Sequence, residues 1–208
     1  MELTIPLQTF ETGKVRLGAP YKSTKLLAPL AYSDSDLQFH SLSLLLPLLT
    51  VKSYDPTTGR LAISFQGAAA AATKIQALQD MLLSAVYNQQ RGWFPGEGSK
   101  GIDDLRSGFQ PILDHGALHL YCPAATQASH IDIKVYKDGV WVTGSLSAAL
   151  LAPGTPVRLA IKLQGISFHQ HPISGAWTGK FRIQHRILAV FIGRAAGAGS
   201  GPGSGPSA

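Results

Sequence analysis

GKFRIQHRI, residues 179–187, is the stretch of this 208-residue chain that best predicts its fold. Side chains of a β-strand alternate between two faces of a sheet. At that period, one face carries Lys180, Arg182, Gln184 and Arg186, and the other carries Phe181, Ile183, His185 and Ile187. The pattern predicts a strand with a cationic face and a mostly apolar face, on which His185 is packed. A row of cations on a sheet suits a polyanion better than a small substrate.

The charge of the chain is concentrated in its C-terminal third. The formal net charge is +6, although only 14% of the residues are charged. Basic and acidic residues balance over residues 1–130, so the excess lies within residues 131–194. A second basic cluster near the start contains Lys14, Arg16, Lys22 and Lys25. Such a distribution favours nucleic acid, an anionic membrane surface or another acidic partner, and ordinary solubilising charge is the plain alternative.

Short strand patterns separated by turns predict a mainly β domain. A turn at residues 55–59 predicts one hairpin, and Lys137-Asp138-Gly139 predicts a second. Residues 73–90 have an apolar stripe at helical spacing, which predicts one central helix packed on a sheet. We therefore expect residues 1–194 to form a single OB-like Greek-key barrel, with a β-sandwich as the alternative. Residues 195–208 contain only Gly, Ser, Pro and Ala and are expected to form a disordered tail.

The cysteine content and the N-terminus favour an intracellular location. Cys122 is the only cysteine, so no disulfide can form within the chain, and a buried structural thiol is expected. The first residues lack the basic and apolar regions of a signal peptide. The most apolar early stretch, at residues 42–49, is too short to span a bilayer. We expect no membrane partner.

Enzymatic and metal-dependent chemistry find little support in the sequence. His169 and His171, with His185 later, have a spacing that could hold a metal, but no nearby Cys, Asp or Glu completes a set. The pair Asp103-Asp104 is typical of a loop or of a helix start. No GxSxG elbow and no phosphate-binding glycine loop occurs. We therefore expect no catalytic residue, no metal site and no cofactor.

The remaining candidate site is a set of basic and aromatic residues that alternate along the predicted strands. Basic side chains bind the phosphates of a nucleic acid, and exposed aromatic rings stack on unpaired bases of any sequence. The stacking candidates are Tyr136, Phe168 and Trp177, whereas Trp141 is more typical of a core position. The cationic candidates are Lys134, Lys137, Lys162, Lys180, Arg182 and Arg186, together with the early cluster of Lys14, Arg16, Lys22 and Lys25. These residues predict one groove for a nucleic-acid strand.

A series of short motifs in a fixed order carries a family likeness. In chain order the motifs are KVRLGAP at 14–20, LP at 46–47, LAISF at 61–65, WF at 93–94, LRSGFQPI at 105–112, LYCP at 120–123, GISF at 165–168, Trp177 and FRIQH at 181–185. The set, which spans most of residues 10–192, resembles the single-stranded DNA-binding proteins of large eukaryotic DNA viruses, such as the algal phycodnaviruses. The resemblance implies an OB-like barrel that coats unwound DNA during viral replication, recombination or repair. The neutral tail departs from the acidic tip with which bacterial single-strand binders often recruit partners.

Three hypotheses follow for the function. The first is a single-stranded DNA-binding protein without sequence preference, with RNA binding, replication proteins as partners and a homo-oligomer left open. If the chain is viral, the host nucleus or a viral replication site is the expected location. The second is a non-enzymatic structural or virion protein that docks an acidic partner through its basic face. The third, a hydrolase or nuclease, is disfavoured because the cationic part of the chain has few acids to gather around a metal.

Overall fold

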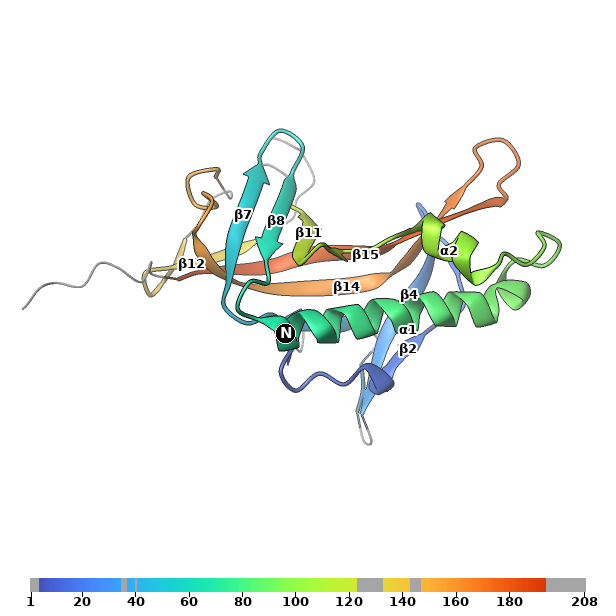
Figure 1. Ribbon diagram of the computed structural model, residues 1–208, viewed down its shortest axis with the longest axis horizontal. Coiled ribbons are helices and arrows are strands. Elements are labelled where there is room, and N and C mark those ends of the chain that lie inside the picture. Colours follow the sequence, from blue (N-terminus) through green and yellow to red (C-terminus); the bar gives the residue numbers. More distant parts are fainter. Residues whose placement is uncertain (1–3, 35–36, 40, 123–132, 143–146, 194–208) are drawn as a thin grey trace, which may run out of the picture.

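The computed structural model describes residues 4–34, 37–39, 41–122, 133–142 and 147–193. The tail expected at 195–208 lies outside the described residues. The described part is mainly β, as predicted, with one large sheet and two α-helices. Figure 1 shows the sheet built around two long strands, with the longer helix running beside them.

The two long strands are β14 (Pro156–Gln170) and β15 (Trp177–Ile192), which pair antiparallel. The predicted strand 179–187 is therefore confirmed as the centre of a longer one. Register shifts interrupt the ladder in three places, one of them between Leu163 and Gly165. An extra residue in one strand shifts the inward–outward alternation. The alternating pattern of β14 therefore breaks in the middle of the strand.

Several shorter strands complete the edges of this pair. The outer edge of β14 pairs in turn with β7 (Leu49–Asp55), β6 (Leu42–Leu45) and β4 (Leu26–Asp34). The outer edge of β15 pairs with β9 (Phe109–Gln110) and β12 (Lys134–Lys137), and β12 pairs with β13 (Val140–Val142). The remaining strands are β1 (Ile5–Pro6), β2 (Val15–Leu17), β3 (Tyr21–Lys22), β5 (Leu37–Phe39), β8 (Arg60–Ser64), β10 (Leu113–Asp114) and β11 (Ala117–Tyr121).

Both predicted hairpins are present. Strands β7 and β8 pair antiparallel across the turn at residues 55–59. Strands β12 and β13 pair across Asp138-Gly139, whose positive φ angles of 51° and 89° are those of a tight two-residue hairpin turn. In both cases the turn residues of the sequence mark where the hairpin lies.

The sheet is not closed, so the expected OB-like barrel is not confirmed. Its main strand order is β10-β11-β8-β7-β14-β15-β12-β13. Strand β11 approaches β15, but no ladder between them occurs among the described residues. At this approach, the backbone N–H of Tyr121 donates a 2.8 Å hydrogen bond to His185 Nε2. In a closed barrel, backbone hydrogen bonds would join β11 to β15. Here the His185 side chain of β15 accepts the hydrogen bond instead.

The described residues form two α-helices, where one was expected. Helix α1 (Ala69–Trp93) extends the predicted 73–90 at both ends. Helix α2 (Ile102–Gly108) is an addition, and Asp103 and Asp104 lie in its first turn, where carboxylates favour the helix dipole. A 3₁₀ helix, η1 (Thr12–Lys14), precedes β2.

The hydrophobic core lies between α1 and one face of the β14–β15 pair. On α1, the buried apolar side chains are Ile75, Leu78, Leu82, Leu83 and Val86. On the strands, Leu163, Ile166, Phe181, Ile183 and Ile187 are each at most 2% exposed. We call this side of the sheet the core face. The opposite side carries the charged residues and is called the cationic face.

Candidate nucleic-acid interface

The alternation predicted for residues 179–187 is confirmed. Phe181, Ile183 and Ile187 are buried on the core face, whereas Lys180 is exposed and Arg182, Gln184 and Arg186 are partly exposed on the cationic face. From Lys180 to Arg186, the first and last cations of β15, the strand advances by roughly 20 Å, at about 3.3 Å per residue. Strand β15 therefore carries a row of cations long enough to contact several phosphates of an extended strand.

The neighbouring strand β14 adds two more basic residues to the cationic face. Lys162 lies opposite Arg186 in the ladder, and Arg158 lies opposite Phe191. Paired residues of adjacent strands point to the same side of a sheet. The alternating residues Val157, Leu159 and Ile161 are fully buried on the core face. Arg158 was not among the predicted site residues, although its place between Val157 and Leu159 is a signal that could have found it.

Strands β12 and β13 extend the cationic face with one cation and two aromatic residues. Lys134 lies opposite Ala189, and Tyr136 lies opposite both Phe191 and Trp141. Val135, between the first two, is 1% exposed and points to the core face. Lys137 shares the side of Val135 by alternation, so it does not join the predicted groove.

Phe168 and Trp177 do not offer the open ring faces that the sequence suggested. They are 3% and 5% exposed and lie on the core face. The ring of Trp177 stacks on Phe94 at a centroid distance of 4.5 Å and meets Phe168 at 5.4 Å. The indole N–H of Trp177 donates to the backbone oxygen of Lys180 at 3.0 Å. These two residues are core residues because the end of α1 brings Phe94 over them.

The early basic cluster is dispersed in the structure. Arg16 lies opposite Ala31, and the alternation of β4, in which Ala28, Leu30 and Tyr32 are buried, places this pair on the cationic face. Lys14 forms a 2.8 Å ion pair with Glu11. The other two members do not lie on that face. Lys22 pairs with Leu26, which pairs in turn with the core residue Phe168, and Lys25 lies in the turn after β3. Only Arg16 continues the row of cations.

Small side chains lie between the long ones in the middle of the cationic face. Ser43, Ala160, Ser167 and Ala189 are 1–7% exposed. Three buried polar atoms in this area have no hydrogen-bond partner within the described part of the chain: Ser43 Oγ, Gln184 Oε1 and Arg186 Nε. Buried polar atoms in proteins are normally paired with protein or water. Because these atoms are almost completely covered by the protein, they are not contact points for a molecule that lies on the face.

The three histidines considered as metal ligands do not lie together. His169 and His171 are exposed at the end of β14 and in the turn that follows it, whereas His185 packs on the core face. In the described ranges, no three His, Cys, Asp or Glu side chains gather in a way that could hold a metal ion. Cys122 is buried, as predicted, and burial raises the pKa of its thiol to about 11. The thiol is therefore protonated at neutral pH and unsuited to nucleophilic chemistry.

His185 makes folding sensitive to acid. Burial lowers the pKa of His185 below its ordinary value of 6.5, a nearby backbone group of Ile183 raises it, and Arg182 lowers it further. Its Nε2 accepts the hydrogen bond of Tyr121 and must be unprotonated to do so. Because the unfolded chain binds the proton more readily, the stabilisation is complete above pH 6.5 and is lost as the pH falls below it.

We expect the His185→Gln variant to have a flatter dependence of stability on pH. Glutamine can accept the same backbone hydrogen bond but does not titrate. The wild-type free energy of unfolding should decline by up to about 1.4 kcal/mol per pH unit more steeply than that of the variant below pH 6.5. Urea unfolding followed between pH 5 and pH 7.5 measures both slopes, and equal slopes would contradict the assignment.

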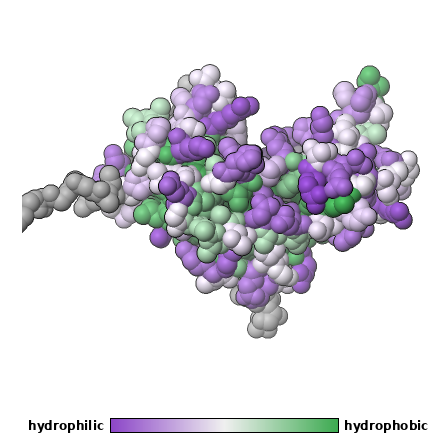
Figure 2. All heavy atoms as spheres, in the orientation of Figure 1, coloured by the Kyte–Doolittle hydropathy of each residue, from purple (hydrophilic) through white to green (hydrophobic). Residues whose placement is uncertain are grey.

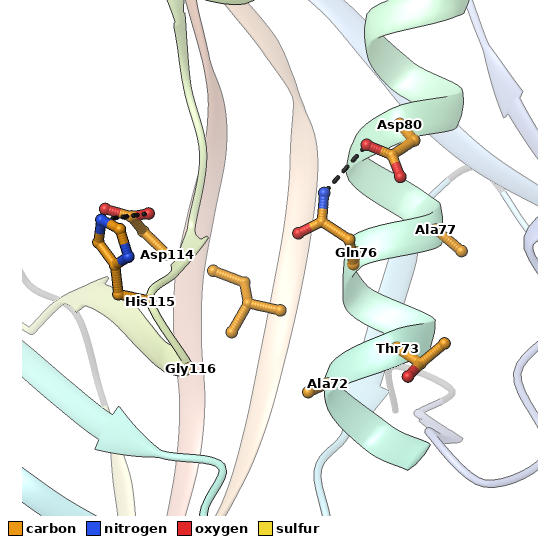
Figure 3. A pocket seen from close by; sticks show the side chains of 9 residues that line it. Ala72, Thr73, Gln76, Ala77, Asp80, Asp114, His115 and Gly116 are labelled. Carbon is orange, nitrogen blue, oxygen red and sulfur yellow. Dashed lines mark hydrogen bonds and ion pairs between the residues drawn. The ribbon is translucent and has the colours of Figure 1, made fainter. Parts of the chain in front are cut away.

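A separate cleft of about 470 Å³ lies between α1 and the β10–β11 turn. Figure 3 shows Gln76 and Asp80 on the helix facing Asp114 and His115 across it. Gln76 donates a 2.9 Å hydrogen bond to Asp80, and His115 is 3.6 Å from Asp114. The imidazole is 94% exposed, and the two carboxylates disfavour a polyanion. This cleft is on the helix side and is not part of the cationic face.

No described helix is long and apolar enough to cross a membrane. Comparisons of the chain with protein-family models, with curated proteins and with solved structures found no match.

Proposed function

We propose that this protein binds single-stranded DNA without sequence preference through its cationic face. One observation carries the proposal: strand register gathers basic residues from four strands on the side of the sheet opposite the core. They are Arg16, Lys134, Arg158, Lys162, Lys180, Arg182 and Arg186. The four strands that carry these cations, β2, β12, β14 and β15, contain no acidic residue. Such a row attracts phosphates and releases their counterions.

The shape of the face favours a single strand over a duplex. The cations follow long strands of a sheet, and sheets twist from strand to strand. A flexible single strand can follow a twisted surface, whereas a duplex stays straight over roughly 150 base pairs. The helix that could enter a major groove, α1, packs on the core face instead.

The proposed role is the coating of unwound DNA during replication, recombination or repair, as the resemblance to viral single-strand binders implies, and it involves no chemical step.

The direct test is a fluorescence anisotropy titration of labelled oligo(dT) and of a duplex of equal length. We expect tighter binding of oligo(dT), with the affinity falling roughly 300-fold between 50 and 200 mM salt if about six phosphates are contacted. Equal or tighter duplex binding would contradict the preference for single strands. Binding of polyglutamate without binding of oligo(dT) would favour docking of an acidic protein instead.

A further inference from the structure

We infer that Trp141, Tyr136 and Phe191 form a stacking site for one unpaired nucleobase at the end of the cationic face. The inference rests on the proposed function and adds its base-recognition element. Cations alone do not distinguish a nucleic acid from another polyanion, because both present only negative charge to them. An exposed aromatic ring does distinguish them, since every base has a face on which it can stack.

The three rings form one cluster contributed by β12, β13 and the end of β15. The ring centroids of Tyr136 and Trp141 are 5.1 Å apart, with an interplanar angle of 65°. Phe191 lies 5.9 Å from Tyr136 and 5.8 Å from Trp141. Tilted and edge-to-face contacts of this kind are the favoured geometry of aromatic pairs. Two neighbours therefore fix the orientation of the Trp141 indole before any ligand arrives.

Trp141 is nevertheless 55% exposed, in contrast to Trp177 at 5%. An isolated exposed apolar side chain is common on protein surfaces. Trp141 is not isolated, because it belongs to an ordered aromatic cluster and lies on the same face as the row of cations. A rigid ring with an open surface is suited to stacking, since little side-chain freedom is lost when a base binds.

Cations adjoin the cluster in register. Arg158 lies opposite Phe191, and Lys134 precedes Tyr136 by two residues on the same face. Stacked bases in a strand are separated by charged phosphates, so a stacking ring with cations beside it matches the repeating chemistry of a single strand. A base paired inside a duplex has both ring faces covered by its neighbours. The occupant assigned by this arrangement is therefore an unpaired base of a polynucleotide.

The test compares Trp141→Ala and Trp141→Phe with wild type on two polyanions, oligo(dT) and heparin, of which only the first has bases. The matched control is Tyr87→Ala, which removes a 45% exposed aromatic side chain from α1. Trp141→Ala should weaken oligo(dT) binding roughly tenfold or more and leave heparin binding and the salt slope unchanged. Trp141→Phe should retain most of the affinity but lose the quenching of tryptophan fluorescence that oligo(dT) causes in wild type.

Several results would overturn the inference. If Trp141→Ala binds oligo(dT) within twofold of wild type, the stacking site is wrong, while salt-dependent binding of wild type would leave the proposed function intact. Equal losses for oligo(dT) and heparin would assign Trp141 a structural or electrostatic role, and thermal unfolding of the variants would show which. If wild type binds heparin but not oligo(dT), the proposed function fails, and the stacking site fails with it.

Discussion

Replacing Lys180, Arg182 and Arg186 together by alanine should lower the affinity for oligo(dT) by about two orders of magnitude near 0.1 M salt. Each phosphate contact with a single strand contributes about 0.7 to the slope of log affinity against log salt, so the loss of three contacts should reduce that slope by about 2. Titrations at a series of salt concentrations measure both quantities. The three residues alternate with core residues, and their substitution should leave the fold in place.

The matched control removes the same charge from elsewhere on the surface. Lys52, Arg91 and Arg106 lie on the β7–β8 hairpin, on α1 and on α2, and all three are exposed. Figure 1 shows that hairpin projecting away from the long strands, and Figure 2 shows hydrophilic side chains spread over the visible surface. The control triple should therefore lose much less affinity. Equal losses for both triples would mean that net charge, rather than the cationic face, determines binding.

Phe181→Ala should destabilise the protein by about 3–5 kcal/mol, the usual cost of emptying a fully buried aromatic site. Phe181 is 1% exposed and stacks on Phe109 at a centroid distance of 5.0 Å. It also contacts Phe168 and Trp177, each with centroids 6.0 Å away. For a chain of this length the loss corresponds to a decrease in melting temperature of roughly 6–20 °C.

Chemical and thermal unfolding measure this effect, with Phe181→Leu and Tyr87→Ala for comparison. Leucine refills part of the site and should cost less than alanine. Tyr87 is 45% exposed, so its truncation should change stability little. A loss below about 1 kcal/mol for Phe181→Ala would contradict the packing of this aromatic cluster. The same packing predicts that substitutions of Phe168 or Trp177 act on stability, not on base stacking.

The sequence was sufficient where a local pattern sets the structure. The alternation at residues 179–187 predicted which side chains of β15 face the core, including the packed position of His185. The apolar stripe at 73–90 predicted most of α1, and the Asp138-Gly139 turn predicted the β12–β13 hairpin. In each case the signal is the period of one element or the conformational preference of a turn, which neighbouring residues determine.

Other features depended on contacts between distant parts of the chain. The sequence favoured Trp177 over Trp141 as an exposed aromatic residue, and the structure shows the reverse. The burial of Trp177 depends on Phe94, which lies at the end of α1 and far from Trp177 in sequence. The exposure of Trp141 follows from its place on the outermost strand of the sheet. Amino-acid type alone does not reveal which ring another element will cover.

The sequence by itself determined that β15 carries a cationic row and that the C-terminal third holds the net charge. The tertiary structure decided which other cations join that row. Strand register brought Arg158 and Lys134 beside it, whereas alternation put Lys137 on the opposite side. It also left the sheet open where His185 meets Tyr121. The physical reason is that alternation is a property of one strand, whereas register and closure depend on which strands pair and on the bulges that bend them.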